Sequence, residues 1–385
     1  MRILFCTKTL GIYGGIERVT IVKANSLLNI NNNEIAICFT DKEGFPYITA
    51  HTISNKIKIY DLNTPYNCIK TKKDVFRYLL PTILKTRKAL KRVIFDFKPD
   101  IIISTGTFEK YAIALIPSKD KFLKIREIHW ASTYRRNFSK SKWKIYLSEF
   151  IENKILSHFF HKTFVLTKSD LIDNHKHDKN YDYMPNPSTF SLPKNISSII
   201  SNKKRIVLAV GRFSYEKNFE DIILIWNNIV KESDGWVLRI VGDGEQKNKL
   251  ENLVKKLNLN DSIEIPGFSS HIEKEMEEAS IYVMTSRWEG FPLVLCEAMT
   301  YGVPAISYDL KYGPKDIIRD GIDGIIVPYN DMSSFGNALI KLIKDNNLRK
   351  TMAYNSYERS LCFCKENIAE RWMLKYNSLY FKKLF

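Results

Sequence analysis

The chain has 385 residues and carries 59 lysines and arginines against 42 acidic residues, which gives a formal net charge of +17. Hydrophobic residues make up 44% of the chain and aromatic residues 12%, a composition that excludes a disordered protein and can supply sizeable cores. No run of about 18 apolar residues occurs, so we expect no transmembrane helix. The charge surplus indicates an anionic partner such as nucleic acid, a membrane surface or a phosphorylated substrate, although a lysine-rich proteome would produce the same surplus.

The cysteines and the N-terminus indicate a cytoplasmic protein. The six cysteines form no Cys-x-x-Cys pair and have no histidine cluster beside them, so we expect buried free thiols in a reducing compartment and no metal site. The short apolar run from Met1 to Phe5 leads at once into a glycine-rich loop and is too short for the hydrophobic part of a signal peptide.

Short apolar runs alternate with longer helical patterns along the whole chain. In the first half we expect strands at residues 3–6, 34–40, 56–60, 101–104, 124–129 and 163–166. In the second half we expect strands at residues 205–210, 237–241, 263–266, 281–284, 305–307 and 324–327. Strands that alternate with helices favour parallel sheets covered on both faces. Because the pattern occurs twice, the predicted fold is α/β with two doubly wound domains.

The boundary between the halves is predicted in a segment rich in proline, asparagine and serine. We expect an N-terminal domain at residues 1–187, a linker at 188–204 and a C-terminal domain at 205–365. Residues 366–385 have a helical pattern with aromatic side chains that need a surface to cover, namely Trp372, Tyr376, Tyr380 and Phe381.

A glycine-rich loop follows the first predicted strand. It runs from Gly11 to Val19, contains Gly14 and Gly15, and opens a helix. Glycines at a strand-to-helix turn let the backbone approach a ligand, with the helix N-terminus aimed at it. The spacing is not that of a dinucleotide-binding G-x-G-x-x-G, so we expect no nicotinamide site. A phosphate contact and a tight turn without ligand remain equal alternatives.

Three further turns follow predicted strands of the second half. The first turn contains Arg212 and Lys217, which suit a diphosphate: the guanidinium binds it in a planar, bidentate way and the ammonium acts as a point charge. The alternative is that both are surface cations without a ligand. Their place at the carboxyl end of a parallel strand favours a ligand. The second turn contains Gly242, and we interpret it as a plain loop with nucleotide lining as the alternative. The third turn is Gly267-Phe268. It is either a plain turn or a place where the backbone approaches the base of a nucleotide.

The most informative stretch is residues 286–299, where a strand is followed by a turn and a helix. The turn carries Glu289, Gly290 and Pro292, and Glu297 lies about one turn inside the helix. A helix N-terminus offers unpaired N–H groups and partial positive charge to a phosphate, while carboxylates accept hydrogen bonds from hydroxyls. A ligand with central phosphates and hydroxyls at both ends suits this arrangement, and a nucleotide sugar is such a ligand.

The first half contributes one histidine and two basic segments. His129 ends a predicted strand beside Trp130, and both a structural role and a role in a site are open. Residues 70–92 have the pattern of an amphipathic basic helix interrupted at Pro81, and residues 119–144 are again basic and aromatic. These segments indicate an anionic membrane surface, nucleic-acid binding or two solvated helix faces. No zinc-finger, RNA-recognition or winged-helix pattern is present, so we expect no nucleic acid partner.

Taken together, these motifs resemble the retaining glycosyltransferases of family 4. Any one motif is weak, but all of them in this order are specific, above all in the second half. The matching positions are Gly14-Gly15, Gly211-Arg212, Glu216-Lys217-Asn218, Gly242-Asp243-Gly244, Glu289-Gly290-Phe291-Pro292, Glu297, 298–306 and 321–328. The resemblance implies the GT-B fold, in which two Rossmann-like domains face each other across a cleft. It also implies that the C-terminal helix crosses back onto the first domain.

The resemblance further implies roles for individual residues. Arg212 and Lys217 would hold the donor diphosphate, and Glu297 would accept hydrogen bonds from the ribose. Glu289 would face the donor sugar, and His129 would contact that sugar near the reacting carbon. The other residues implied at the donor are Gly14, Gly15, Gly242, Gly267, Phe268, Gly290, Phe291, Pro292 and Leu293.

The implied activity is retaining transfer of a sugar from a nucleotide diphosphate. Negative charge develops on the leaving phosphate, and two cations with a helix N-terminus would stabilise it without a metal. The sequence contains no Asp-x-Asp, and we expect no metal or other cofactor. The donor would be a UDP-hexose or UDP-N-acetylhexosamine, with GDP as the alternative carrier.

The expected setting is the assembly of a bacterial capsule, O-antigen or exopolysaccharide. The acceptor would be an oligosaccharide or an undecaprenyl-diphosphate-linked saccharide at the inner face of the plasma membrane. A nucleotide-sugar 2-epimerase of similar architecture is one alternative. A non-catalytic basic module that binds membrane or nucleic acid is the other, but it leaves the strand-end motifs unexplained.

Overall fold

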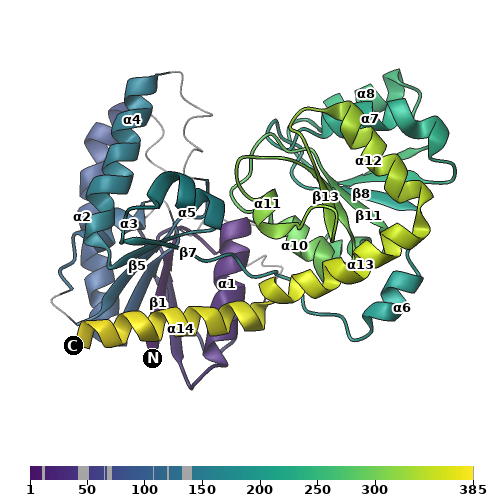
Figure 1. The fold of residues 1–385 in the computed structure, drawn as a ribbon. Coiled ribbons are helices and arrows are strands. Elements are labelled where there is room, and N and C mark those ends of the chain that lie inside the picture. The colour runs from purple at the N-terminus through teal and green to yellow at the C-terminus, as the bar shows by residue number, and fades with distance from the viewer. Residues whose placement is uncertain are drawn as a thin grey trace. The chain divides into compact units, whose positions relative to one another are not determined.

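The computed structural model describes residues 1–10, 14–41, 52–64, 66, 72–106, 108–118, 121–131 and 141–384, without the side chains of 72–76, 142, 144, 148, 383 and 384. The chain divides into two compact units (Figure 1). Unit 1 is Met1–Pro187 together with Lys365–Phe385, and unit 2 is Ser188–Cys364. Within the described residues, no helix is both long enough and apolar enough to span a membrane.

Unit 1 contains a parallel seven-stranded sheet with the order β3-β2-β1-β4-β5-β6-β7. Its strands are β1 (Arg2–Thr7), β2 (Glu34–Phe39), β3 (Lys58–Asp61), β4 (Ile101–Ser104), β5 (Leu123–Glu127), β6 (Lys162–Val165) and β7 (Tyr181–Tyr183). Its helices are α1 (Gly15–Leu28), α2 (Lys72–Phe97), α3 (Glu109–Ala114), α4 (Lys142–Phe150), α5 (Lys168–His175) and α14 (Lys365–Leu384). After α4 the chain continues as a π-helical turn, η2 (Ile151–Ile155), and a 3-10 turn, η3 (Leu156–Phe159).

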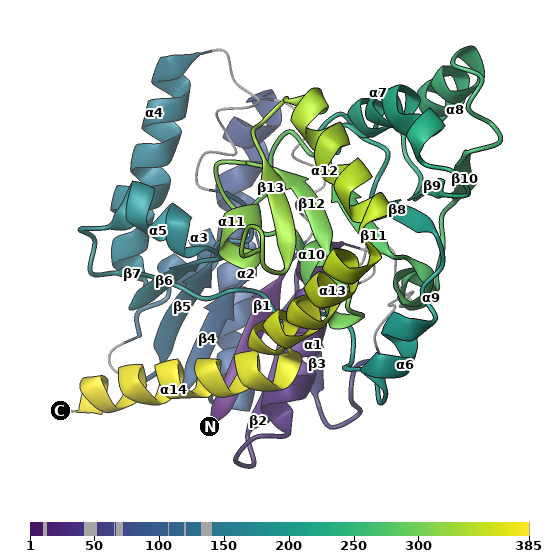
Figure 2. The ribbon, with the colours of Figure 1, turned by 45° about the vertical axis from the view of Figure 1, so that its right-hand side comes forward.

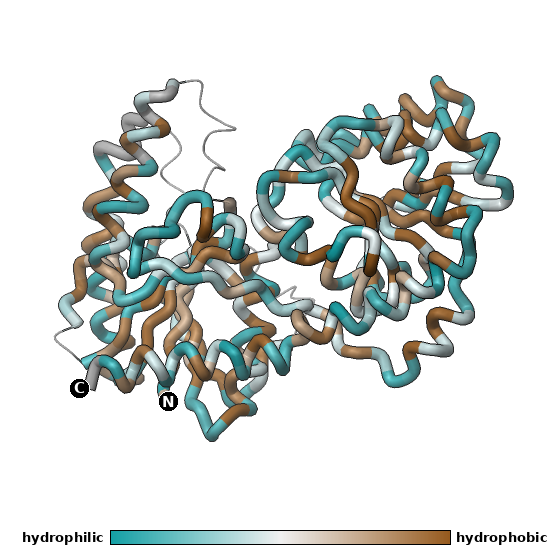
Figure 3. The backbone as a smooth tube through the Cα atoms, viewed as in Figure 1, coloured by the Kyte–Doolittle hydropathy of each residue, from teal (hydrophilic) through white to brown (hydrophobic). Residues whose placement is uncertain are grey.

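Both faces of the unit 1 sheet are buried. Successive side chains of a strand point to opposite faces, so Ile3 and Phe5 enter one core while Leu4 and Cys6 enter another. The first core is covered by α1 and α14, and the second by α2 and α3. Two-sided burial requires continuous apolar strands, which is the pattern of β1 and β4. Figure 3 shows the hydrophobic residues concentrated along the central strands of each unit.

Unit 2 contains a parallel six-stranded sheet with the order β10-β9-β8-β11-β12-β13. Its strands are β8 (Ile206–Val210), β9 (Val237–Val241), β10 (Ile263–Gly267), β11 (Ile281–Met284), β12 (Ala305–Tyr308) and β13 (Gly324–Val327). Its helices are α6 (Ile196–Ser201), α7 (Phe219–Ile229), α8 (Lys247–Lys256), α9 (Ile272–Glu278), α10 (Leu293–Thr300), α11 (Pro314–Ile317), α12 (Met332–Lys344) and α13 (Asn346–Ser360).

The predicted α/β fold with two parallel sheets is confirmed, and every predicted strand is present with ends shifted by at most two residues. The C-terminal helix also crosses back as expected, because α14 packs beside α1 in unit 1 (Figure 2). Trp372 and Tyr376 are buried in the unit 1 core, and Tyr380 packs against it. Phe381 is 59% exposed, so it does not share that surface.

Two details differ from the sequence-based prediction. Residues 188–204, expected as a linker, pack within unit 2 and contain α6. Asn195 caps this helix by accepting from the N–H of Ser198, and Ile200 is buried, so the polar composition marks a capped turn rather than a free connection. The predicted interruption at Pro81 is also wrong, because α2 continues through it. Pro81 lies on the exposed side, where water can satisfy the carbonyl that loses its partner.

Candidate active site

The candidate donor site of unit 2 is built from loops at the carboxyl ends of β8, β9, β10 and β11. In a parallel sheet these ends lie along one edge, where ligands of open α/β folds bind. Backbone hydrogen bonds join the first three loops. The N–H of Gly211 donates to Val241 O at 3.0 Å, and the N–H of Gly242 donates to Gly267 O at 2.9 Å.

Gly242 is explained by this loop packing. A Cβ atom built on Gly242 would lie 1.9 Å from the carbonyl oxygen of Gly211, so no side chain fits there. Gly244 meets the backbone of Phe213 in the same way, with 2.5 Å from its Cβ position to the carbonyl oxygen. Both glycines let the loop after β9 lie directly against the loop after β8.

The structure brings Lys217 and Glu289 together. Nζ of Lys217 lies 2.7 Å from Oε1 of Glu289, and Ser286 donates to the same oxygen at 2.8 Å. The two charged side chains are 25% and 13% exposed, so they face a partly open edge. Arg212 is exposed, and its side chain makes no hydrogen bond or ion pair with the described residues.

Further contacts fix the loops that carry this ion pair. The N–H of Arg287 donates to Glu216 O at 2.7 Å, and the hydroxyl of Thr285 donates to Asn218 O at 3.0 Å. The Arg287 guanidinium also lies over the Tyr215 ring, 4.2 Å from its centroid. The loop after β8 and the loop after β11 are therefore held side by side by one backbone hydrogen bond and two side-chain contacts.

Glu297 lies on α10 and is 4% exposed. Its Oε1 accepts a hydrogen bond from the hydroxyl of Thr189 at 2.5 Å. Burial raises the pKa of the neighbouring Cys296 thiol, and the charge of Glu297 raises it further. The Glu297 carboxylate is thus buried beneath the loops of the site and is not on their exposed side.

The N-terminus of α10 has no side-chain cap. Pro292 stands at the N-cap position, and the N–H groups of the first helical residues, Leu293 and Val294, have no partner within the helix. Phe291 and Pro292 are buried, and Gly290 precedes them. Gly313 has a φ of +102° and lies so close to Pro292 that a Cβ atom would meet its ring at 2.7 Å. The turn before α10 is therefore tightly packed, while the first N–H groups of the helix have no hydrogen-bond partner among the described residues.

At the outer end of the same edge, Gly267 and Phe268 follow the strand β10. Gly267 has a φ of +89°, and Phe268 is 64% exposed. A large aromatic ring with a solvent-accessible face at a strand end suits the stacking of a planar base.

In unit 1, Gly14 and Gly15 open α1, while Gly11 to Tyr13 lie outside the described residues. A Cβ atom on Gly14 would lie 2.0 Å from Oε2 of Glu17, which means that this carboxylate folds back over the helix N-terminus. Burial raises the pKa of Glu17, while the charges of His129 and Lys8 act in the opposite direction.

His129 lies just after β5, and its side chain is 2% exposed. Neither ring nitrogen has a hydrogen-bond partner among the described residues. Nε2 lies 3.4 Å from Oε2 of Glu127.

Known proteins share both the sequence pattern and the fold. The family model described as "Glycosyl transferases group 1" matches residues 194–359. The amylovoran biosynthesis glycosyltransferase AmsD of Erwinia amylovora is 31% identical over 366 residues, which are 93% of this chain and 95% of that protein. The chain belongs to the group 1 glycosyl transferases.

Two further similar proteins extend over nearly the full length of this glycosyltransferase. An alpha-1,4-N-acetyl-D-galactosaminyltransferase of Campylobacter jejuni is 26% identical over 377 residues, 97% of each protein. A mutant of TarM from S. aureus, solved with Fondaparinux, alpha-GlcNAc-glycerol and UDP, superposes with a TM-score of 0.79, covering 98% of this chain and 99% of that chain at 16% identity. The latter likeness confirms the fold.

Sequence reasoning found most of the strand-end residues of this glycosyltransferase but missed several side chains around them. Thr189 lies in the segment taken as a linker, and Ser286 is an ordinary residue of the loop before Glu289. Glu127 and Glu17 beside His129 were also missed, because a single acidic residue carries no signal of burial. The roles assigned to the predicted residues stay predictions.

The basic segments are only partly described. Lys70, Lys119 and residues 132–140 lie outside the described residues, and the side chains of Lys72, Lys73, Lys142 and Lys144 do too. Within the described part of the chain, no group of three or more His, Cys, Asp or Glu residues is arranged to hold a metal ion.

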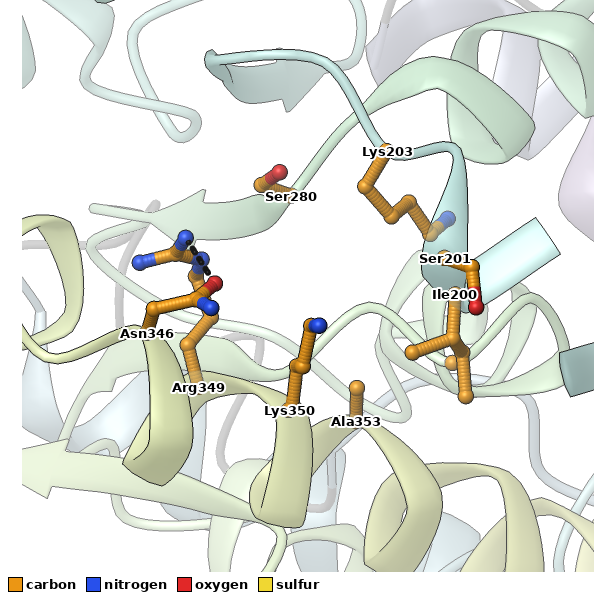
Figure 4. A pocket seen from close by; sticks show the side chains of 9 residues that line it. Ile200, Ser201, Lys203, Ser280, Asn346, Arg349, Lys350 and Ala353 are labelled. Atoms are coloured by element: carbon orange, nitrogen blue, oxygen red, sulfur yellow. Dashed lines mark hydrogen bonds between the residues drawn. The ribbon is translucent and has the colours of Figure 1, made fainter. Parts of the chain in front are cut away.

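A cavity of about 70 Å³ in unit 2 lies elsewhere. Figure 4 shows Lys203, Ser280 and Lys350 around it, and Gly302 also lines it. Lys203, Ser280 and Gly302 precede β8, β11 and β12, so the cavity lies at the amino ends of the strands. It is therefore at the edge of the sheet opposite the candidate donor site.

Proposed function

We propose that this glycosyltransferase moves a hexose or N-acetylhexosamine from a UDP carrier to a lipid-linked or oligosaccharide acceptor, with retention at the sugar carbon and without a metal. The observation that carries the proposal is the Lys217–Glu289 ion pair beside the uncapped N-terminus of α10. Arg212, with no side-chain partner among the described residues, adds a second cation at the same edge.

The charges at this edge suit a nucleotide diphosphate. As the bond between the sugar carbon and the phosphate oxygen breaks, its electron pair stays on the phosphate. Arg212, Lys217 and the free N–H groups of α10 are donors for that charge. The acceptor oxygen then bonds to the carbon on the face that the phosphate leaves, and its proton passes to the departing phosphate oxygen. Glu289 accepts hydrogen bonds from the sugar, and Glu297 from the ribose.

The similar proteins support the choice of donor and acceptor. TarM was solved with UDP, and an exposed Phe268 suits stacking on a uracil ring. The name of the Campylobacter jejuni relative gives an acceptor that ends in PP-undecaprenol, and AmsD is an amylovoran biosynthesis enzyme. These names favour a saccharide carried on a lipid diphosphate in surface-polysaccharide assembly.

Nucleotide release from a panel of UDP- and GDP-sugars tests the proposal, with membrane lipid extract as acceptor and with or without EDTA. We expect UDP release from one sugar donor and the same rate in EDTA. Loss of activity in EDTA would overturn metal independence alone. Conversion of the donor to an isomer without UDP release would identify a 2-epimerase. No release, together with no thermal stabilisation by UDP or GDP, would overturn the donor-site assignment.

Peripheral attachment to an anionic membrane is part of the proposal, and α4 with η2 suits it better than α2. On α2, Leu90, Val93 and Phe97 belong to the core, although Leu80, Leu84 and Phe95 are exposed. On α4 and η2, by contrast, a row of apolar side chains is exposed by 40–70%: Trp143, Tyr146, Leu147, Phe150, Ile151 and Ile155. Trp and Tyr favour the boundary between lipid and water, and flanking lysines favour anionic headgroups.

The base of this row is anchored in the protein. Glu152 of η2 is buried and accepts from Nζ of Lys110 at 2.8 Å, and it also pairs with Arg126. The hydroxyl of Tyr111 donates to the same carboxylate at 2.8 Å. These contacts of Glu152 fix the end of the helix in the protein, so the apolar side chains of its outer face stay exposed.

Flotation with phosphatidylglycerol-containing vesicles tests the attachment. We expect the double variant Trp143→Ser and Tyr146→Ser to bind at least tenfold more weakly at low salt. Phe381→Ser is the matched control, because Phe381 is also exposed but lies on α14. Equal binding of the double variant, or no binding by the wild-type protein, would overturn the membrane proposal.

A further inference from the structure

The cavity at the amino ends of the unit 2 strands is lined by three cations. Lys203 lies between α6 and β8, and Arg349 and Lys350 lie on α13. Ser280 and Asn346 add neutral polar side chains (Figure 4). Among the described residues, no acidic side chain lines this cavity. The lining is therefore rich in positive charge and in polar groups.

The guanidinium of Arg349 is held in place by the protein itself. It donates to Leu342 O at 2.5 Å and Ile343 O at 3.1 Å, near the end of α12, and to Oδ1 of Asn346 at 2.8 Å. It also lies over the Trp236 ring, 4.9 Å from the centroid. These bonds use at most three of its five N–H groups, so the guanidinium keeps donors for a ligand.

The two lysines of the cavity keep donors as well. Nζ of Lys203 donates to Met276 O at 2.6 Å, which uses one of the three N–H groups of the ammonium. Lys350 is exposed, and its side chain makes no hydrogen bond or ion pair with the described residues. In Figure 4 the Lys350 side chain extends into the space between the other labelled residues. Each ammonium therefore has N–H groups left for an anion.

The cations in this cavity are disfavoured by their surroundings. Burial lowers the pKa of Arg349, and the charge of Arg205 lowers it further, while Asp345 acts in the opposite direction. Burial also lowers the pKa of Lys203 to about 7, although Glu277 raises it. Desolvation and like charges both disfavour the charged form of a base. An anion in the cavity would stabilise these charged forms.

The size of the cavity suits a small anion. It has a volume of about 70 Å³. A cavity needs about 10–15 Å³ to hold one water, so there is room for an ion of five heavy atoms such as phosphate. The oxygens of phosphate accept charge-assisted hydrogen bonds from guanidinium and ammonium groups. Lys350 and Asn346 are exposed, so the rest of a phosphate ester can extend into solvent on their side.

We propose that this cavity binds the phosphate group of a small phosphorylated ligand through Lys203, Arg349 and Lys350. The inference does not depend on the proposed function, because every lining residue belongs to unit 2 and none lies in the donor loops. The cavity is thus a second anion site, at the edge of the sheet opposite the diphosphate. Free phosphate and a phosphomonoester share the chemistry that this site recognises.

Equilibrium dialysis of the full chain with ³²P-labelled inorganic phosphate tests the site. Ionic strength is kept constant with chloride, so that a general salt effect is the same in every sample. Saturating UDP occupies the donor loops. We expect one equivalent of saturable phosphate under these conditions. The absence of saturable binding would overturn the proposal.

Lys350→Met should weaken phosphate binding at least about tenfold, the scale of one hydrogen bond to a charged group. Folding should be unaffected, because Lys350 is exposed and has no partner among the described residues. Lys256→Met is the matched control, since Lys256 on α8 is also exposed and has no such partner. Lys217→Met should bind phosphate like wild type, because Lys217 belongs to the donor loops. Unchanged binding in Lys350→Met, or a comparable loss in either other variant, would contradict the assignment.

Labelled sulfate adds a pH signature for Lys203, because sulfate stays a dianion across the neutral range. The charged form of Lys203 predominates below its pKa of about 7, so the affinity for sulfate should fall as the pH rises through that value. Lys203→Met should bind sulfate more weakly below pH 7 and show a smaller fall. A wild-type affinity that does not change with pH, or an unaltered fall in Lys203→Met, would refute the contact with Lys203.

Competition with glycerol 3-phosphate distinguishes the two sources of the phosphate group. If it displaces labelled phosphate at lower concentration than unlabelled phosphate does, the ligand is a phosphomonoester whose remaining part contacts the exposed side of the cavity. If it displaces the label only at higher concentration, the site takes the free ion. Failure of both compounds to displace the label would overturn the proposal.

Discussion

Replacing Lys217 by alanine tests the donor site most directly. Nζ of Lys217 lies 2.7 Å from Glu289 Oε1, and the side chain is only 25% exposed, so its position is fixed before a donor binds. In the proposed function the same ammonium faces a diphosphate that gains charge as the sugar leaves. Loss of one preorganised contact of this kind costs about 2.7 kcal/mol or more, which corresponds to a fall in kcat of about a hundredfold.

The same substitution should hardly alter folding, because a partly exposed ion pair contributes about 0–1 kcal/mol. Lys249→Ala is the matched control, since Lys249 lies 2.6 Å from Glu220 in the same unit but on α8. Initial rates of UDP release at saturating donor, measured with Tm for both proteins, separate the two effects. A Lys217→Ala enzyme that turns over like wild type would refute the charge argument, and an equally slow Lys249→Ala enzyme would show a loss unrelated to the site.

Three further predictions concern other features of the two units. Glu297→Ala should lower turnover about a hundredfold in the same release assay. Thr189→Val removes only one hydrogen-bond donor to that carboxylate and should lower turnover about tenfold. A larger loss of turnover in Thr189→Val than in Glu297→Ala would mean that the ribose binds elsewhere. Gly242→Ala should lower the free energy of unfolding by at least about 2 kcal/mol in urea titrations, because the alanine Cβ would lie 1.9 Å from a carbonyl oxygen. Gly321→Ala is the control, because no atom lies within 4 Å of its Cβ position. It should lower the free energy of unfolding by only about 1 kcal/mol, the strain of a φ of +74°. The pKa of Lys23 is about 8 in the folded protein against 10.5 in the unfolded chain, so between pH 8 and 10.5 the folded protein binds fewer protons than the unfolded chain. The free energy of unfolding therefore rises with pH in this range. Lys23→Met should reduce this rise in a pH series of urea titrations.

The strands were predictable because a parallel sheet buried on both faces demands apolar runs. β7 was missed because it has only three residues, Tyr181–Tyr183, and includes a charged side chain. The strand ends then identified the loops that carry Arg212, Lys217 and Glu289, since parallel strands bring all their carboxyl ends to one edge.

Other contacts in each unit are tertiary contacts that local composition does not encode. Residues 188–204 look like a linker, yet Thr189 reaches Glu297 within the core of unit 2. Lys23 and Glu127 look like ordinary surface charges, yet both are buried and paired across a sequence separation of 104 residues. Such pairs become visible only once the helix that carries one residue is packed on the strand that carries the other.

The loops of the donor site are held together by backbone hydrogen bonds in addition to the charges they present. Arg287 N–H to Glu216 O and Gly242 N–H to Gly267 O join neighbouring loops without involving any functional side chain. A substitution at Lys217 or Glu289 should therefore change turnover and leave the frame intact. A substitution at Gly242 should lower stability and turnover together, because it forces apart the loops that position the charges. Correlating the two quantities across such variants distinguishes residues that act on the donor from residues that hold the site in shape.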